Sequence, residues 1–108
     1  MKKRIYLFCS QGMSTSMLAH KMQEVANSNN MPVIVEAHAH GLLEEKIQED
    51  HPDVILLGPQ VKYLYKETIE KFGHCGAPIE VISSEDYGVM DGAKVLKMSL
   101  LALKNFKK

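Results

Sequence analysis

Short apolar segments alternate along the chain with longer segments in which apolar residues recur every three or four positions. Four short segments are rich in Val, Ile and Leu and end at turn residues, as is typical of buried β-strands: 5–9, 33–37, 54–57 and 79–82. The longer segments carry the apolar stripe of amphipathic helices. Strands that alternate with helices predict right-handed βαβ units and a parallel sheet covered on both faces. The expected fold class is therefore α/β.

The helical stripes follow the strands in a regular order. Ser14 is expected to cap the first helix, which should stop in the polar run 27–30. The other helices are expected in the segments 41–50, 61–72 and 95–103. A polar segment, 83–92, separates the last strand from the last helix. No repeat interrupts this order, and we expect a single domain over residues 1–108.

The amino-acid composition of the chain limits the classes of partner that it is expected to bind. The chain has 108 residues, 45% of them hydrophobic and 24% charged, which is ordinary for one globular domain. Thirteen basic and thirteen acidic residues cancel, so no field of one sign attracts nucleic acid. The apolar runs are too short to span a bilayer, and we expect a cytoplasmic protein. Its two cysteines, Cys9 and Cys75, have no metal-finger spacing and should be reduced thiols.

Cys9 follows the first expected strand, at the sheet edge where parallel α/β proteins bind ligands. The next seven residues, 10–16, contain no proline, and Gly12 permits the tight curvature that turns successive N–H groups toward an anion. Hydroxyl donors come from Ser10, Ser14, Thr15 and Ser16. The positive end of the following helix adds to this field and favours a thiolate at Cys9. Such a thiolate can attack phosphorus and hold the product as phosphocysteine.

The segment lacks the residues of other phosphate-binding loops. It contains neither Gly-Lys-Ser/Thr nor GxGxxG, so ATP and NAD have little support. Low-molecular-weight cysteine phosphatases have an arginine six positions after the nucleophile, where this chain has Thr15. No lysine or arginine lies between Arg4 and Lys21. Without a guanidinium clamp, we infer a site that accepts and passes on phosphoryl groups rather than hydrolysing them.

Three residues beyond this segment are possible accessory or partner-contact residues. Gln60 follows the third strand at the same edge, where its amide could contact phosphate or a partner, or simply belong to a turn. Asp86 follows the fourth strand and could act as an acid. A carboxylate beside phosphocysteine would repel it, however, so a solvated charge or a partner contact is the favoured interpretation. Tyr87 is a candidate wall of the site.

Metal binding has little support. His38 and His40 form an HxH pair, but no third ligand lies at a spacing typical of metal sites, and we expect neither a metal nor another cofactor.

Met13 and Met17 flank the cysteine segment, where they can meet the apolar surface of a partner.

The chain resembles the enzyme IIB components of the phosphoenolpyruvate-dependent sugar phosphotransferase system, in the lactose, cellobiose and chitobiose family. The matching motifs are IYLFCS at 5–10, GMSTS at 12–16, PVIVEA at 32–37, VILLGPQ at 54–60, Tyr87-Gly88 and Asp91-Gly92. The resemblance implies a three-layer α/β/α fold with a four-stranded parallel sheet in the order 2-1-3-4. Low-molecular-weight tyrosine phosphatases share this fold.

The resemblance also implies that Cys9 is a phosphocysteine intermediate. Its phosphate-binding residues would be Ser10, Gln11, Gly12, Met13, Ser14, Thr15 and Ser16. The expected partners are a IIA component, whose phosphohistidine is the donor, and a membrane IIC component that presents cellobiose, chitobiose or lactose. The activity would be that of a protein-phosphohistidine–sugar phosphotransferase. Two alternatives stay open: a low-molecular-weight phosphatase or arsenate reductase, and a redox-sensing module whose Cys9 never carries phosphate.

Overall fold

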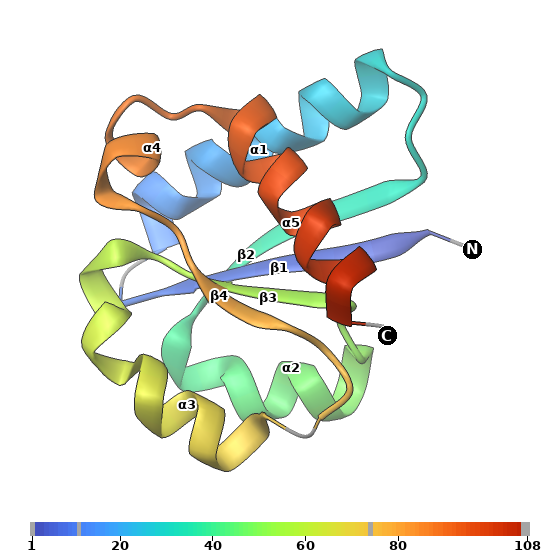
Figure 1. Ribbon diagram of the computed structural model, residues 1–108. Coiled ribbons are helices and arrows are strands. Elements are labelled where there is room, and N and C mark those ends of the chain that lie inside the picture. Colours follow the sequence, from blue (N-terminus) through green and yellow to red (C-terminus); the bar gives the residue numbers. More distant parts are fainter. Residues whose placement is uncertain (1, 11, 74, 107–108) are drawn as a thin grey trace.

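The computed structural model describes residues 2–10, 12–73 and 75–106 and contains a parallel sheet between two layers of helices (Figure 1). The four strands are β1 (Lys3–Cys9), β2 (Val33–Ala39), β3 (Val54–Leu57) and β4 (Ile79–Val81). Their order in the sheet is β2-β1-β3-β4, and every pair is parallel. The α/β class and the strand order expected from the resemblance are both confirmed.

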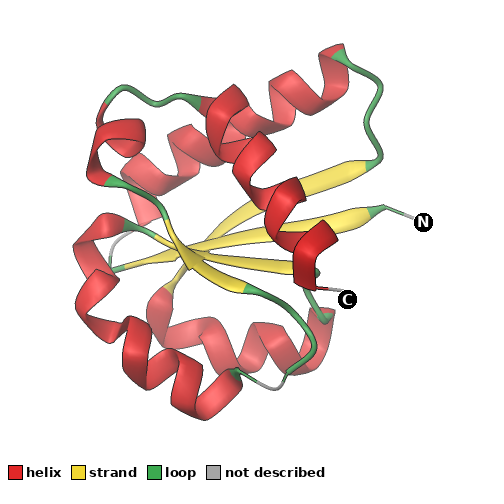
Figure 2. Cartoon of the chain, in the orientation of Figure 1, coloured by secondary structure: helices red, strands yellow, loops and turns green. Residues whose placement is uncertain are grey.

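The helices divide between the two faces of the sheet (Figure 2). One face is covered by α1 (Gly12–Ser28), α4 (Ser84–Gly88) and α5 (Gly92–Phe106). The other is covered by α2 (Leu43–Asp50) and α3 (Tyr65–Phe72). Two 3-10 turns, η1 (His40–Leu42) and η2 (Pro59–Leu64), lead into α2 and α3. The chain thus forms the expected three layers.

Strand β1 is buried on both faces because alternate side chains enter different cores. Ile5 and Leu7 pack on the α1 and α5 side, whereas Tyr6 and Phe8 pack on the α2 and α3 side. All four side chains have no exposed surface. The near-continuous apolar sequence of β1, the strand that ends at Cys9, reflects this burial on both faces.

Two expectations about element boundaries were wrong. Helix α1 begins at Gly12, so Ser14 lies inside its first turn and is not the cap. Serine is favoured at caps, but 10–16 offers three serines, so residue type alone did not identify the start. The polar segment 83–92 also contains a short helix, α4. Ser83 caps it, because its Oγ accepts a hydrogen bond from Asp86 N at 3.1 Å.

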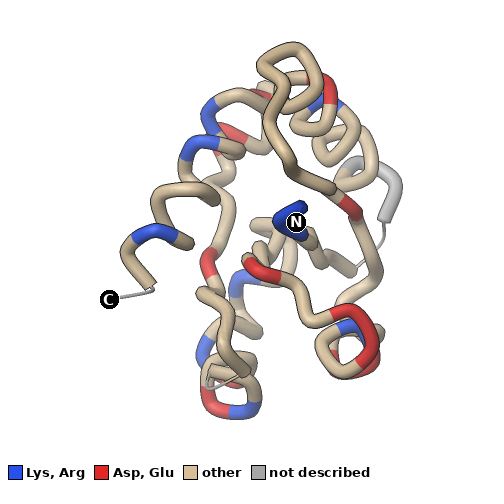
Figure 3. The backbone as a smooth tube through the Cα atoms, turned by 90° about the vertical axis from the view of Figure 1, so that its right-hand side faces the viewer, with Lys and Arg blue, Asp and Glu red and all other residues tan. Residues whose placement is uncertain are grey.

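Charge is distributed without a dominant sign. Both signs occur over the molecule as a whole, but the only charged residues of α5 are lysines, whereas acidic residues predominate on α2 (Figure 3). Within the described part of the chain, no helix has the length and apolar character needed to cross a bilayer.

Candidate functional site

Cys9 is the last residue of β1 and lies at the carboxyl edge of the sheet. It pairs with Ala39 of β2, and the preceding residue, Phe8, pairs with Leu57 of β3. The chain runs from β1 to β2 on one side and then returns to β3 on the other, so the strand order reverses beside Cys9. Crevices in open α/β sheets form at such reversals. Cys9 itself is 2% exposed, whereas Ser10 is exposed.

Most of the expected cysteine loop is helical. Residues 12–16 form the start of α1, so the turn between β1 and α1 is much tighter than the sequence indicated. The first four N–H groups of an α-helix have no partner within the helix and carry its positive partial charge. These groups begin three residues after Cys9. Gln11 lies outside the described residues, as do the side chains of Met13 and Ser14.

Thr15 connects the first turn of α1 to α4. Its side chain is fully buried, and its Oγ1 lies 3.0 Å from the hydroxyl oxygen of Tyr87, where either hydroxyl can donate. Tyr87 is 7% exposed and belongs to the core beneath α1 and α5. Tyr87 therefore supports the helix that follows Cys9, while the exposed Ser16 points to solvent one position further along.

Asp86 is held by α5. Its Oδ1 accepts a charge-assisted hydrogen bond from Lys94 Nζ at 3.2 Å, and the Asp86 side chain is 15% exposed. This hydrogen bond to Asp86 raises the pKa of Lys94 above its ordinary value. Lys94 was not a candidate in the sequence, since eight positions separate it from Asp86 and only the turn between α4 and α5 brings them together.

Gly58 lies against Cys9 from the β3 side. Its N–H donates to Phe8 O at 2.8 Å, and a Cβ built on Gly58 would lie 3.2 Å from Cys9 Cβ. The same Cβ would lie 2.9 Å from Gln60 Oε1, so the Gln60 side chain folds back toward Gly58. The sequence singled out Gln60 at this edge but not Gly58. The available signal was its place directly after a buried strand, at the edge that also holds Cys9.

The two histidines of the HxH pair do not converge. His38 Nε2 lies 3.0 Å from Glu36 Oε1, and His40 Nε2 lies 3.3 Å from Thr68 Oγ1 on α3. Burial lowers the pKa of His40. Across residues 2–10, 12–73 and 75–106, no group of three His, Cys, Asp or Glu side chains is arranged to hold a metal ion.

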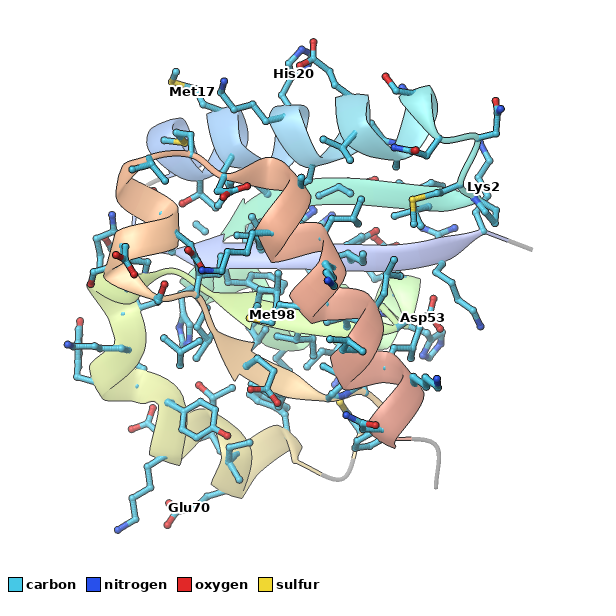
Figure 4. All side chains as sticks on the ribbon, turned by 45° about the horizontal axis from the view of Figure 1, so that its top comes forward. Lys2, Met17, His20, Asp53, Glu70 and Met98 are labelled. Atoms are coloured by element: carbon cyan, nitrogen blue, oxygen red, sulfur yellow. The ribbon has the colours of Figure 1, made fainter. Side chains whose placement is uncertain are left out.

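Apolar side chains are exposed on the elements around this edge. Met17 of α1 is 57% exposed, Tyr63 of η2 is 75% exposed, and Val89, just after α4, is 71% exposed. Met17 projects from α1 away from the sheet, at the same end of the molecule as α4 and η2 (Figure 4). Exposed apolar side chains of this kind are frequent at protein–protein interfaces.

The sequence matches a family model described as the lactose/cellobiose-specific IIB subunit of the PTS system, over residues 4–98. Two relatives from Lactococcus lactis, the galactose-specific EIIB component of subsp. cremoris and the cellobiose-specific EIIB component of subsp. lactis, are each 40% identical over 97 residues. Each alignment covers 87% of this chain and 90% of the relative. Equal identity to relatives named for different sugars indicates that overall similarity does not select the sugar.

Two solved structures share the fold. The lactose-specific IIB domain from Streptococcus pneumoniae superposes with a TM-score of 0.84 at 23% identity, covering 94% of this chain and 98% of that one. The cellobiose-specific IIB component from Borrelia burgdorferi superposes with a TM-score of 0.80 at 39% identity, covering 97% and 94%.

Proposed function

Because the chain belongs to the lactose/cellobiose-specific IIB subunits of the phosphotransferase system, we propose that it carries a phosphoryl group on Cys9 between two partner proteins. Membership makes it a phosphotransferase component for cellobiose-like sugars. The observation that carries the proposal is the place of Cys9, at the carboxyl edge of the central strand and three residues before the N-terminus of α1. That geometry suits a nucleophile beside an anion-binding site.

The first step takes the phosphoryl group from a IIA component. The Cys9 thiolate attacks the phosphorus of a phosphohistidine, so that an S–P bond forms while the N–P bond breaks. The bonding electron pair remains on the imidazole nitrogen, which regains a proton from solvent. Because Cys9 is only 2% exposed, entry of the donor requires a local rearrangement that exposes the sulfur. The exposed Met17 and Tyr63 give that donor an apolar surface on which to dock.

The second step passes the group to a sugar held by the membrane IIC component. A sugar hydroxyl attacks the phosphorus, an O–P bond forms, the S–P bond breaks, and the hydroxyl proton passes to a base or to water. The Cys9 thiolate is regenerated. We expect a β-glucoside-type disaccharide such as cellobiose, chitobiose or lactose. The chain would act from the cytoplasm and meet the membrane only through IIC.

The phosphoryl oxygens would be bound by the segment 10–16, chiefly through backbone N–H groups at the start of α1. The Ser10 and Ser16 hydroxyls are exposed and can donate as well. The buried Thr15 hydroxyl is engaged with Tyr87, so we assign Thr15 a contribution through its N–H. Tyr87 acts as a support of this helix end, and Asp86, paired with Lys94, anchors α4 rather than serving as an acid.

Intact-mass measurement tests the proposal. The protein is incubated with phosphoenolpyruvate, the two general phosphotransferase proteins and a cognate IIA. We expect one phosphoryl group on the wild type, none on Cys9→Ser, and one on the matched control Cys75→Ser, since Cys75 is an exposed thiol on a different part of the chain. A wild-type protein that stays unmodified would refute the carrier role. Sustained hydrolysis of p-nitrophenyl phosphate that depends on Cys9 would support the phosphatase alternative instead.

A further inference from the structure

Gly58 is adjacent to Cys9 at the point where the strand order reverses. The hydrogen bond from Gly58 N to Phe8 O, 2.8 Å long, fixes the backbone of residue 58 beside the end of β1. A Cβ at residue 58 would approach Cys9 Cβ to 3.2 Å, closer than most Cβ atoms come to any neighbour. A side chain here would therefore press directly on the nucleophile.

The backbone conformation at Gly58 does not explain the glycine. Its dihedral angles, φ −66° and ψ 155°, lie in the extended region that every residue type can adopt. Gly76, by contrast, has a φ of +97° and needs glycine for that reason. Gly58 instead leaves space, since the position that its Cβ would occupy lies within 3.2 Å of both Cys9 Cβ and Gln60 Oε1.

Gln60 borders that space with a neutral group that can form hydrogen bonds. Residue 60 is exposed, yet its Oε1 lies 2.9 Å from the position of a Gly58 Cβ, so the carboxamide turns back toward the end of β1. A carboxamide has two N–H donors as well as the oxygen. Its terminal torsion rotates with little preference, so the amino group can replace the oxygen on the side that faces Gly58.

We propose that Gly58 and Gln60 form a second wall of the phosphoryl site, beside Cys9 at the end of β3. Gly58 positions Cys9 by leaving room beside it, and the Gln60 amino group donates to a phosphoryl oxygen once the group is on sulfur. The inference rests on the carrier role of Cys9 proposed above. A neutral donor suits a carrier, because it orients the phosphoryl group without the charge that would oppose its departure.

Gly58→Ala tests the positioning role, with Gly41→Ala as its matched control. No atom lies within 4 Å of a Cβ at Gly41, so that change adds the same methyl group in open space. We expect Gly58→Ala to reduce the limiting rate of phosphoryl transfer from IIA by about tenfold, the effect of one misplaced contact in the transition state. The half-saturating IIA concentration and the unfolding midpoint should stay close to the wild-type values. Gly41→Ala should transfer at the wild-type rate.

Gln60→Leu and Gln60→Glu test the donor. Leucine removes the N–H groups at similar size, whereas glutamate places a negative charge beside the phosphoryl oxygens, so we expect rates in the order wild type, leucine, glutamate. Gln48→Glu, on exposed α2 surface, is the control for the added charge. In NMR spectra of the wild type, the side-chain amide signals of Gln60 should shift when Cys9 is phosphorylated, and those of Gln48 should not.

The outcomes separate this inference from the carrier role. If the wild type takes no phosphoryl group, the carrier role itself fails. If the wild type is phosphorylated while Gly58→Ala and Gln60→Leu both keep its limiting rate, the second wall is refuted. A change in half-saturation alone would also refute it, because it would identify Gln60 as a contact for IIA only. Should Gly58→Ala fail to fold, Gln60→Leu and the amide shifts decide.

Discussion

The hydrogen bond between Thr15 and Tyr87, at the start of the helix that follows Cys9, should contribute measurably to the free energy of unfolding. Thr15 Oγ1 is fully buried and lies 3.0 Å from the Tyr87 hydroxyl. Tyr87→Phe removes one partner and leaves the Thr15 hydroxyl in a dry interior, which costs about 1–3 kcal/mol. A 108-residue domain should then lose roughly 4–8 °C in unfolding midpoint for each kcal/mol.

A double-mutant cycle in urea isolates this interaction. Thr15→Val removes the other hydroxyl at nearly constant shape, and the double variant removes both, which leaves no buried polar group unpaired. The double variant should be more stable than the sum of the two single losses predicts, by about 1 kcal/mol. Tyr63→Phe is the matched control: that ring is 75% exposed, and its change should stay within about 0.5 kcal/mol.

Additive losses would refute the reasoning. If the double variant loses the sum of the single losses to within about 0.3 kcal/mol, the two hydroxyls do not depend on each other. A Tyr87→Phe variant as stable as the wild type would lead to the same conclusion. In either case α4 would not support the start of α1 through this contact.

Two further predictions concern packing and pH. Gly92→Ala should destabilise the fold by about 1–3 kcal/mol, because its Cβ would lie 2.9 Å from the backbone carbon of Lys21, and Gly41→Ala should be neutral in the same thermal melts. Burial and the hydrogen bond to Asp50 raise the pKa of Tyr6 from 10 to about 12. The folded state therefore favours the neutral hydroxyl, so its contribution is complete below pH 10 and is lost toward pH 12. Urea midpoints should fall further over this interval in the wild type than in Tyr6→Phe, which keeps the loss that comes from the raised pKa of Lys94.

The strands could be predicted from sequence because their burial is nearly complete. Segment 54–57 was placed without error, and it is fully buried on both faces. The end of α2 could also be predicted from the sequence, because Pro52 disfavours a helical conformation at the preceding residue. In the structure His51 is left-handed and ends the helix. By contrast, Ser83 and α4 were missed, because one five-residue helix carries too little periodicity to distinguish it from a polar loop.

The surroundings of the candidate site were predictable only in part. Cys9 could be singled out because a reactive residue type follows a buried strand and precedes small polar residues. The periodicity of apolar residues contains no information about the order of strands in a sheet. The expected strand order therefore came from the family resemblance. The contacts of Thr15 with Tyr87 and of Asp86 with Lys94 depend on how α4 folds against its neighbours, and no local pattern specifies them.

The sequence by itself determined the α/β class, the place of Cys9 at the end of a buried strand and the lack of lysine and arginine in residues 5–20, because these properties follow from the order and type of neighbouring residues. Only the tertiary structure decided that α1 begins at Gly12 and that Gly58 lies against Cys9. The second of these depends on where β1 and β3 end relative to each other, and hydrogen bonds between segments some fifty positions apart set that register.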